Sequence, residues 1–201
     1  MNLILESNKI DDYLNATSII DYNERSIQLL SEKLKTECSS QMHYIKKAYH
    51  YVRDEIAHSA DIQAQSITLK ASEVLKEKHG ICFAKSHLLA ALLRANKIPT
   101  GFCYQRLILD DEKSPYLVLH GLNGVYVDKV NKWIRLDARG NNNGIDAQFS
   151  LDQEKLAFPI REVFGEEDIF TVFSNPNNNV VRALTTYKTR MELWDHIPRH
   201  L

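Results

Sequence analysis

The stretch GICFAKSHLLAALLRA, residues 80–95, decides the fold of this chain. Leucines and alanines cover nearly every side of a helix drawn from Ile81 to Ala95, so that helix has no face suited to water. Pro99 bars its continuation, because proline lacks the backbone N–H that a helix interior requires. The pattern predicts a helix at the centre of the molecule, with the other elements packed around it.

Further helices are expected before this segment. Apolar residues spaced i, i+3, i+4, i+7 and i+11 predict one stripe on a helix. The members of this stripe are Ile45, Ala48, Tyr49, Val52 and Ile56. Ile27, Leu30 and Leu34 also recur at helical spacing. A short helix over Val74 to Lys78 would end before Gly80.

Beyond Pro99 the apolar period changes from helical to two. Four strands rich in aromatic and β-branched residues are predicted: Gly101 to Leu109, Tyr116 to His120, Val125 to Asp128 and Trp133 to Asp137. The short connections between the later strands imply antiparallel pairing. Helices up to about residue 97, followed by strands from about 98 to 138, indicate the α+β class.

The C-terminal part adds one clear element. An apolar stripe there predicts a C-terminal helix closed by Pro198, and it runs through Val180, Leu184, Tyr187, Met191 and Trp194. Ser150 and Gln153 have the spacing of a capping box, but no apolar period follows them. We expect a single domain over residues 1–201, with a core at about 45–140, an N-terminal helical part at 1–44 and a C-terminal extension at 141–201.

Composition narrows the possible function classes. The 201 residues are 44% apolar and 25% charged, which is typical of a globular protein. With 25 basic and 26 acidic residues there is no basic excess for nucleic acid, and no apolar run approaches the length of a membrane span. Leu3–Leu5 are followed at once by Glu6, unlike a secretory signal. The odd set Cys38, Cys82 and Cys103 suits a reducing compartment, so we expect a cytoplasmic protein with no nucleic-acid or membrane partner.

Cys82 is the first candidate for chemistry. It lies in the first turn of the predicted central helix, where unpaired backbone N–H groups and the helix dipole lower a thiol pKa and stabilise a thiolate. The same N–H groups could stabilise an oxyanion on a substrate beside the sulfur. An isolated cysteine is more often a small core residue, and this interpretation suits Cys38 and Cys103, because neither begins a helix.

His120 and Asp137 are candidates for the base and its orienting acid. His120 ends the apolar stretch YLVLH, and Asp137 ends the stretch WIRLD in the same manner. Each residue alone is more often structural or solvated. Together with Cys82 at the start of a buried helix, however, the order Cys, His, Asp fits the arrangement that an acyl-transfer triad requires.

Strand register bears on this triad. A plain hairpin would pair Val127 with Trp133, and Asp137 and His120 would then face opposite sides of the sheet. The triad therefore needs a bulge or break near residues 121–124, where two glycines favour one. A regular ladder through this segment would count against the triad.

A zinc site is the main rival to a nucleophilic cysteine. His79, Cys82 and His87 form a sparse cluster of possible ligands. The cluster lacks a fourth spaced ligand, and His87 would point away from Cys82 around the helix. We therefore expect no metal site.

Together these stretches resemble the transglutaminase-like superfamily. Residues 80–99 resemble its nucleophile helix, and Tyr51–Ile56 resembles the helix before it. His120 before Val125–Val127, followed by Trp133–Asp137, resembles the histidine and aspartate strands of that family. The resemblance covers roughly residues 45–140. It implies a papain-like α+β architecture, in which the central nucleophile helix packs on an antiparallel sheet, and no essential cofactor for many bacterial members.

The resemblance also implies a reaction. Cys82 would be the nucleophile, His120 the general base and then acid, and Asp137 the orienting group. The thiolate would attack a peptide or amide carbonyl to leave a thioester. Water would then hydrolyse this thioester, or an amine would attack it and accept the acyl group. Gln105 or Tyr104, on the strand after the central helix, are candidates for the oxyanion donor.

Several alternatives stay open at this point. Protease, amidase, deamidase and cross-linking enzyme share this chemistry with peptide or amide substrates, and the sequence does not separate them. A transglutaminase-like module that only binds a partner, without catalysis, is the second hypothesis. The oligomeric state is also open.

Overall fold

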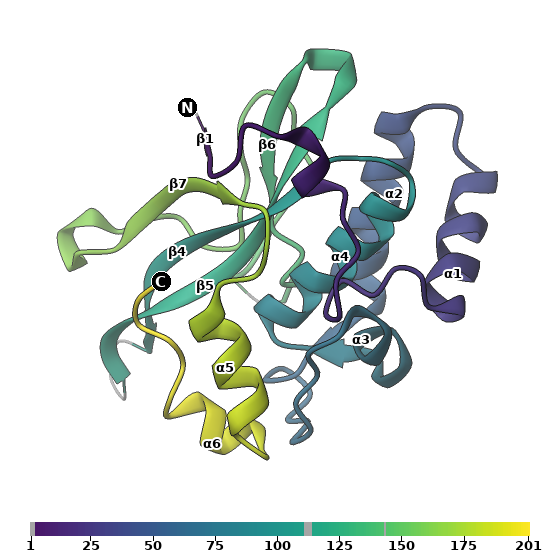
Figure 1. Cartoon of the computed structure of the whole chain (residues 1–201). Coiled ribbons are helices and arrows are strands. Elements are labelled where there is room, and N and C mark those ends of the chain that lie inside the picture. Colours follow the sequence, from purple (N-terminus) through teal and green to yellow (C-terminus); the bar gives the residue numbers. More distant parts are fainter. Residues whose placement is uncertain (1–2, 111–113, 143) are drawn as a thin grey trace.

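The computed structural model describes residues 3–110, 114–142 and 144–201, and its helices and strands are arranged as Figure 1 shows. The helices are α1 (Arg25–Thr36), α2 (Gln41–Glu55), α3 (Ala71–Glu77), α4 (Cys82–Ala95), α5 (Asn178–Thr186) and α6 (Arg190–Trp194). The strands are β1 (Ile4–Leu5), β2 (Ala57–His58), β3 (His79–Gly80), β4 (Thr100–Asp110), β5 (Ser114–Val127), β6 (Lys132–Leu136) and β7 (Glu167–Phe173). Within these ranges no helix combines the length and apolarity that crossing a membrane requires.

The central helix is confirmed in α4. Every residue from Phe83 to Arg94 is buried, as the apolar pattern on all sides predicted. Helices α1, α2 and α3 pack against α4 on one side, and strand β5 contacts it on another. At its C-terminal end the buried Arg94 donates hydrogen bonds to the carbonyl oxygens of Asn15, Thr100 and Ser174. Hydrogen bonds to three separate segments of the chain therefore fix that end of α4.

The main sheet has five strands in the order β1-β7-β4-β5-β6, and all its pairs except β1–β7 are antiparallel. The α+β class with a helix packed on a largely antiparallel sheet is thus confirmed. Strand β7 and the short β1 were not predicted from the sequence. Residues 116–128, expected as two strands, form one continuous strand β5 that ends at Val127.

The expected bulge at residues 121–124 is wrong, because the assumed register was wrong. Strand β5 pairs with β4 without a break through these residues and with β6 from Asn123 onward, and Val127 lies opposite Lys132 rather than Trp133. A 3₁₀ turn and Asn131, in the left-handed region at φ 47°, form a four-residue connection, one residue shorter than the expected register requires. Asp137 directly follows Leu136, the last residue of β6 that pairs with β5. With this register Asp137 lies on the same side of the sheet as His120.

The glycine at position 121 serves packing instead of a turn. A Cβ on Gly121 would come within 2.5 Å of Cδ1 of Phe83. The absent side chain thus lets the first turn of α4 rest directly on β5, one residue from His120. This close approach places the start of the helix beside the histidine.

The C-terminal part also departs from prediction. The expected single helix is divided into α5 and α6, because Thr189 and Glu192 form a capping box that starts a new helix. Ser150 accepts a hydrogen bond from the backbone N–H of Gln153, but no helix follows, as the missing apolar period indicated. The backbone N–H of Leu119 donates to the carbonyl of Pro198 at 2.7 Å, so the chain end returns to strand β5.

Candidate active site

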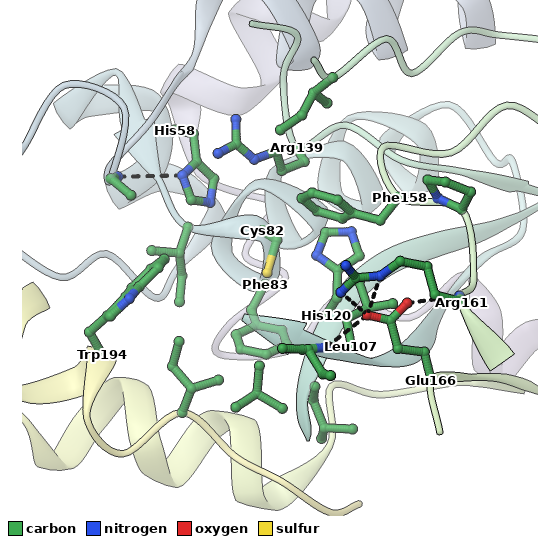
Figure 2. A pocket seen from close by; sticks show the side chains of 18 residues that line it. His58, Cys82, Phe83, Leu107, His120, Arg139, Phe158, Arg161, Glu166 and Trp194 are labelled. Atoms are coloured by element: carbon green, nitrogen blue, oxygen red, sulfur yellow. Dashed lines mark hydrogen bonds and ion pairs between the residues drawn. The ribbon is translucent and has the colours of Figure 1, made fainter. Parts of the chain in front are cut away.

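A cavity of about 620 Å³ opens where the first turn of α4 meets strands β4 and β5. The loop after β6 and the C-terminal helix α6 complete its wall. Figure 2 shows the side chains that surround it, with the sulfur of Cys82 at its centre. The residues of the cavity are His58, Ala60, Ile81, Cys82, Phe83, Leu107, Ile108, Val118, Leu119, His120, Arg139, Ile145, Phe158, Pro159, Arg161, Glu166, Trp194 and Ile197.

Cys82 is the first residue of α4 and is partly exposed to this cavity. Ile81 precedes it in an extended conformation, and no side chain caps the helix start. The backbone N–H groups of the first turn therefore keep their hydrogen-bonding capacity beside the sulfur. This is the local environment that favours negative charge at a helix N-terminus.

His120 and Asp137 form a buried pair on the neighbouring wall. His120 Nε2 lies 2.8 Å from Asp137 Oδ2, and the side chains are 7% and 0% exposed. Asp137 also accepts hydrogen bonds from the backbone N–H groups of Arg139 and Ala157, each at 3.0 Å. These contacts fix the carboxylate. Because Asp137 occupies Nε2, Nδ1 is the ring nitrogen left for Cys82.

Opposing effects set the charge of this pair. Burial by itself would lower the pKa of His120, but the charge of Asp137, the nearby Cys82 sulfur, and hydrogen bonds to both raise it to about 10. Burial would raise the pKa of Asp137, yet the charge and hydrogen bond of His120 keep it below its ordinary value. At neutral pH the imidazole therefore carries a proton between a carboxylate and a sulfur.

Aromatic packing fixes the orientation of the His120 ring. Phe158 meets it edge to face, with ring centroids 5.0 Å apart and an interplanar angle of 87°. Phe158 lies in the segment after β6, directly beyond Ala157, whose backbone binds Asp137. One short stretch of chain thus positions both the imidazole and its carboxylate.

His58 and Arg139 form the opposite wall, and the sequence analysis identified neither. Burial and the positive charge of Arg139 lower the pKa of His58 to about 3, so this imidazole is neutral. Arg139 donates two hydrogen bonds to Asp61, at 2.6 and 2.8 Å. A local signal existed only for Arg139, which lies two residues after Asp137.

The two oxyanion candidates from the sequence lie elsewhere. Tyr104 Oη accepts a hydrogen bond from the backbone N–H of Asn177 at 2.9 Å. Gln105 Nε2 donates to Asp168 at 2.9 Å and to the carbonyl of Phe158. Neither side chain lines the cavity, so the structure does not bring them to Cys82.

The residues considered for zinc are also engaged elsewhere. His79 bonds to the hydroxyls of Ser59 and Ser66, and His87 Nδ1 lies 2.8 Å from the carbonyl oxygen of Leu69. In the described part of the chain, no group of three or more histidine, cysteine or acidic side chains could hold a metal ion. The arrangement at Cys82 is suited to nucleophilic chemistry instead.

Comparisons with known proteins identify the family and support the fold. A model of the transglutaminase-like superfamily matches residues 28–138, more than half of the chain. A structure from Cytophaga hutchinsonii, named "Putative Cysteine Protease", has a TM-score of 0.54 at 18% identity, covering 66% of this chain and 43% of that one. The periplasmic domain of TgpA from Pseudomonas aeruginosa has a TM-score of 0.46 at 15% identity, covering 63% of this chain and 45% of that one.

The matched region thus spans less than half the length of either solved chain. None of the curated proteins matches the chain. The likeness to the Cytophaga hutchinsonii structure supports the fold, and the superfamily match covers α4, His120 and Asp137. The chain belongs to the transglutaminase-like superfamily, a family that includes thiol-dependent enzymes, as its sequence resemblance predicted.

Proposed function

We propose that this chain is a thiol-dependent acyl-transfer enzyme that acts on peptide or amide carbonyls through Cys82, His120 and Asp137. One observation carries the proposal. A buried, charged His120–Asp137 pair lines the same cavity as a cysteine at an uncapped helix start. A scaffold without catalysis has no need to bury an imidazolium beside a thiol, because burying charge is costly.

The proposed reaction has two halves. The sulfur of Cys82 attacks the carbonyl carbon, and the electron pair of the C=O bond moves to oxygen. When the C–N bond breaks, His120 gives its proton to the departing amine and a thioester remains. His120 then takes a proton from the water that attacks the thioester, the C–S bond breaks, and the carboxylic acid leaves while the Cys82 thiolate and the protonated His120 are restored.

The cavity lining suggests the substrate side chain. Most of its wall beyond Cys82 is apolar: Phe83, Leu107, Ile108, Val118, Leu119, Trp194 and Ile197. Its two guanidinium groups are each paired with a carboxylate, Arg139 with Asp61 and Arg161 with Glu166. We propose a peptide that carries a large apolar side chain near the attacked carbonyl. A charged side chain would find no unpaired partner of opposite charge among the described residues of this apolar wall and would lose its hydration.

The test is product analysis on a defined peptide set. The protein is incubated with peptides that differ only in one side chain (phenylalanine, leucine, aspartate or lysine) plus a tagged amine. Masses then report hydrolysis, loss of ammonia or amine incorporation. We expect turnover with the apolar peptides that a Cys82→Ala variant lacks. Equal product with wild type and Cys82→Ala, or no product with wild type, would contradict the proposal.

A further inference from the structure

We propose that His58 donates a hydrogen bond from Nε2 to the oxyanion that forms when Cys82 attacks a carbonyl. This inference rests on the proposed acyl-transfer function and supplies the donor that Gln105 and Tyr104 do not provide. The oxyanion site would then consist of the His58 ring on one side and the backbone N–H groups at the start of α4 on the other.

Backbone pairing ties His58 to the nucleophile segment. Strand β2 runs parallel to β3, with His58 opposite Gly80, two residues before Cys82. The backbone N–H of Ser59 donates to the carbonyl of Gly80 at 3.1 Å, and that of Ala57 donates to the carbonyl of Lys78 at 2.9 Å. The ring is therefore carried by backbone that is hydrogen-bonded to the segment leading into α4.

Hydrogen bonding indicates which ring nitrogen carries the proton. The backbone N–H of Ala60 donates to Nδ1 of His58 at 3.4 Å, so Nδ1 acts as an acceptor and the proton lies on Nε2. No partner for Nε2 is found among residues 3–110, 114–142 and 144–201. In Figure 2 the His58 ring and the His120 ring lie on opposite sides of the Cys82 sulfur.

Charge around His58 favours a donor that keeps its proton. Burial and the nearby positive groups Arg139, Lys85 and His120 lower the pKa of His58 to about 3, although the carboxylate of Asp61 acts in the opposite direction. The imidazole is neutral at working pH and donates a hydrogen bond without transferring a proton. The ammonium of Lys85 donates to the carbonyl oxygens of Arg53 and Ile56 at the end of α2, and Arg139 donates to Asp61, so both cationic groups are engaged with other partners.

The experiment compares two reactions of the same sulfur. Acylation of Cys82 by p-nitrophenyl acetate passes through an oxyanion, whereas alkylation by iodoacetamide does not. Both rates are measured for wild type, His58→Ala and His58→Gln, with Cys82→Ala as the blank. We expect His58→Ala to slow acylation by a factor on the order of 10²–10³ and to change alkylation only a few-fold.

His58→Gln is the matched control, because its amide keeps an N–H donor of similar reach. We expect it to restore acylation to within about tenfold of wild type. Equal losses in acylation and alkylation would instead show that His58 only supports the fold around Cys82, and unchanged acylation would show that it has no role. Both outcomes overturn the inference. Failure of the proposed function is seen separately, as absent peptide turnover by wild type.

Discussion

The two histidines of the cavity are alike in burial and opposite in charge. His120 and His58 are each 6% exposed, yet the pKa of His120 is raised to about 10 and that of His58 is lowered to about 3. The carboxylate of Asp137 faces the first ring, and the guanidinium of Arg139 faces the second. The same residue type can thus supply a proton on one wall and only a hydrogen bond on the other.

Their backbones differ as well. His120 lies within the long strand β5 and pairs there with Gln105 of β4, whereas His58 ends the two-residue strand β2. The proton-carrying ring is therefore held by the main sheet, and the neutral ring by the short strand β2, which pairs with the segment that leads into α4. Substitutions on the two walls should have separable effects.

The largest effect is expected for His120→Gln. Removing the imidazole removes both the positive partner of the Cys82 sulfur and the proton for the leaving amine. Peptide turnover should fall by a factor on the order of 10⁵–10⁶, and iodoacetamide alkylation of Cys82 should slow as well. A variant that keeps wild-type alkylation would contradict the pairing of these two groups.

Asp137→Asn should come next. The amide keeps the shape but can hold His120 in the wrong tautomer, so turnover should fall by a factor on the order of 10⁴. Removing the carboxylate should also lower the pKa of His120, because Asp137 is one of the charges that raise it. NMR titration of the His120 ring checks this shift directly. An unchanged His120 titration would show that the carboxylate does not control the proton.

Gly121→Ala tests how closely the helix must approach the strand. A Cβ there would overlap Phe83, so we expect a loss of about 1–3 kcal/mol in the free energy of unfolding. Displacement of Cys82 from His120 should reduce turnover by about a hundredfold. The double variant Gly121→Ala with Phe83→Leu makes room for the methyl group and should recover part of both losses. Additive losses would show that Phe83 is not the obstacle.

The smallest effects are opposite pH dependences of stability. Because the pKa of His120 is raised, its contribution to stability is full below about pH 6.5 and is lost as the pH rises through about 10. Wild type should therefore lose stability relative to His120→Gln over this window. Denaturant unfolding at several pH values measures the difference, and parallel curves would contradict the raised pKa.

His58 should show the reverse trend. Its pKa is lowered to about 3, so the unfolded chain takes up a proton below about pH 6.5 that the folded chain excludes. Wild type should lose stability relative to His58→Gln as the pH falls from 6.5 toward 3. Equal acid sensitivity in the two proteins would show that the buried ring can accept the proton.

Local patterns in the sequence were enough for the central helix and for the three residues proposed as the triad. Cys82 begins a helix that is apolar on all sides, and His120 and Asp137 end apolar stretches. The register between their strands was not predictable, because it depends on the left-handed conformation of Asn131. Asparagine adopts that conformation more readily than most residues, but the composition of the turn does not say how many residues the connection holds.

Long-range pairing explains what the sequence analysis missed. His58 reaches the cavity only because β2 pairs with β3, across the helix α3. Trp194 lines the cavity from the last helix. The sequence predicted a C-terminal helix but not the part of the molecule against which it packs. Gln105 and Tyr104 were chosen because their strand follows the central helix, but their side chains bind Asp168 and the backbone of Asn177 instead.

The most direct test of the account is site-resolved alkylation of the three cysteines in the folded protein. Cys38 is an internal control of similar, partial exposure, and burial raises the pKa of its thiol. Burial raises the pKa of the Cys103 thiol to about 12. With limiting iodoacetamide at neutral pH, peptide mass spectrometry should find Cys82 modified at least about a hundredfold faster than Cys38. Modification of Cys82 no faster than Cys38 would contradict an activated sulfur at the start of α4.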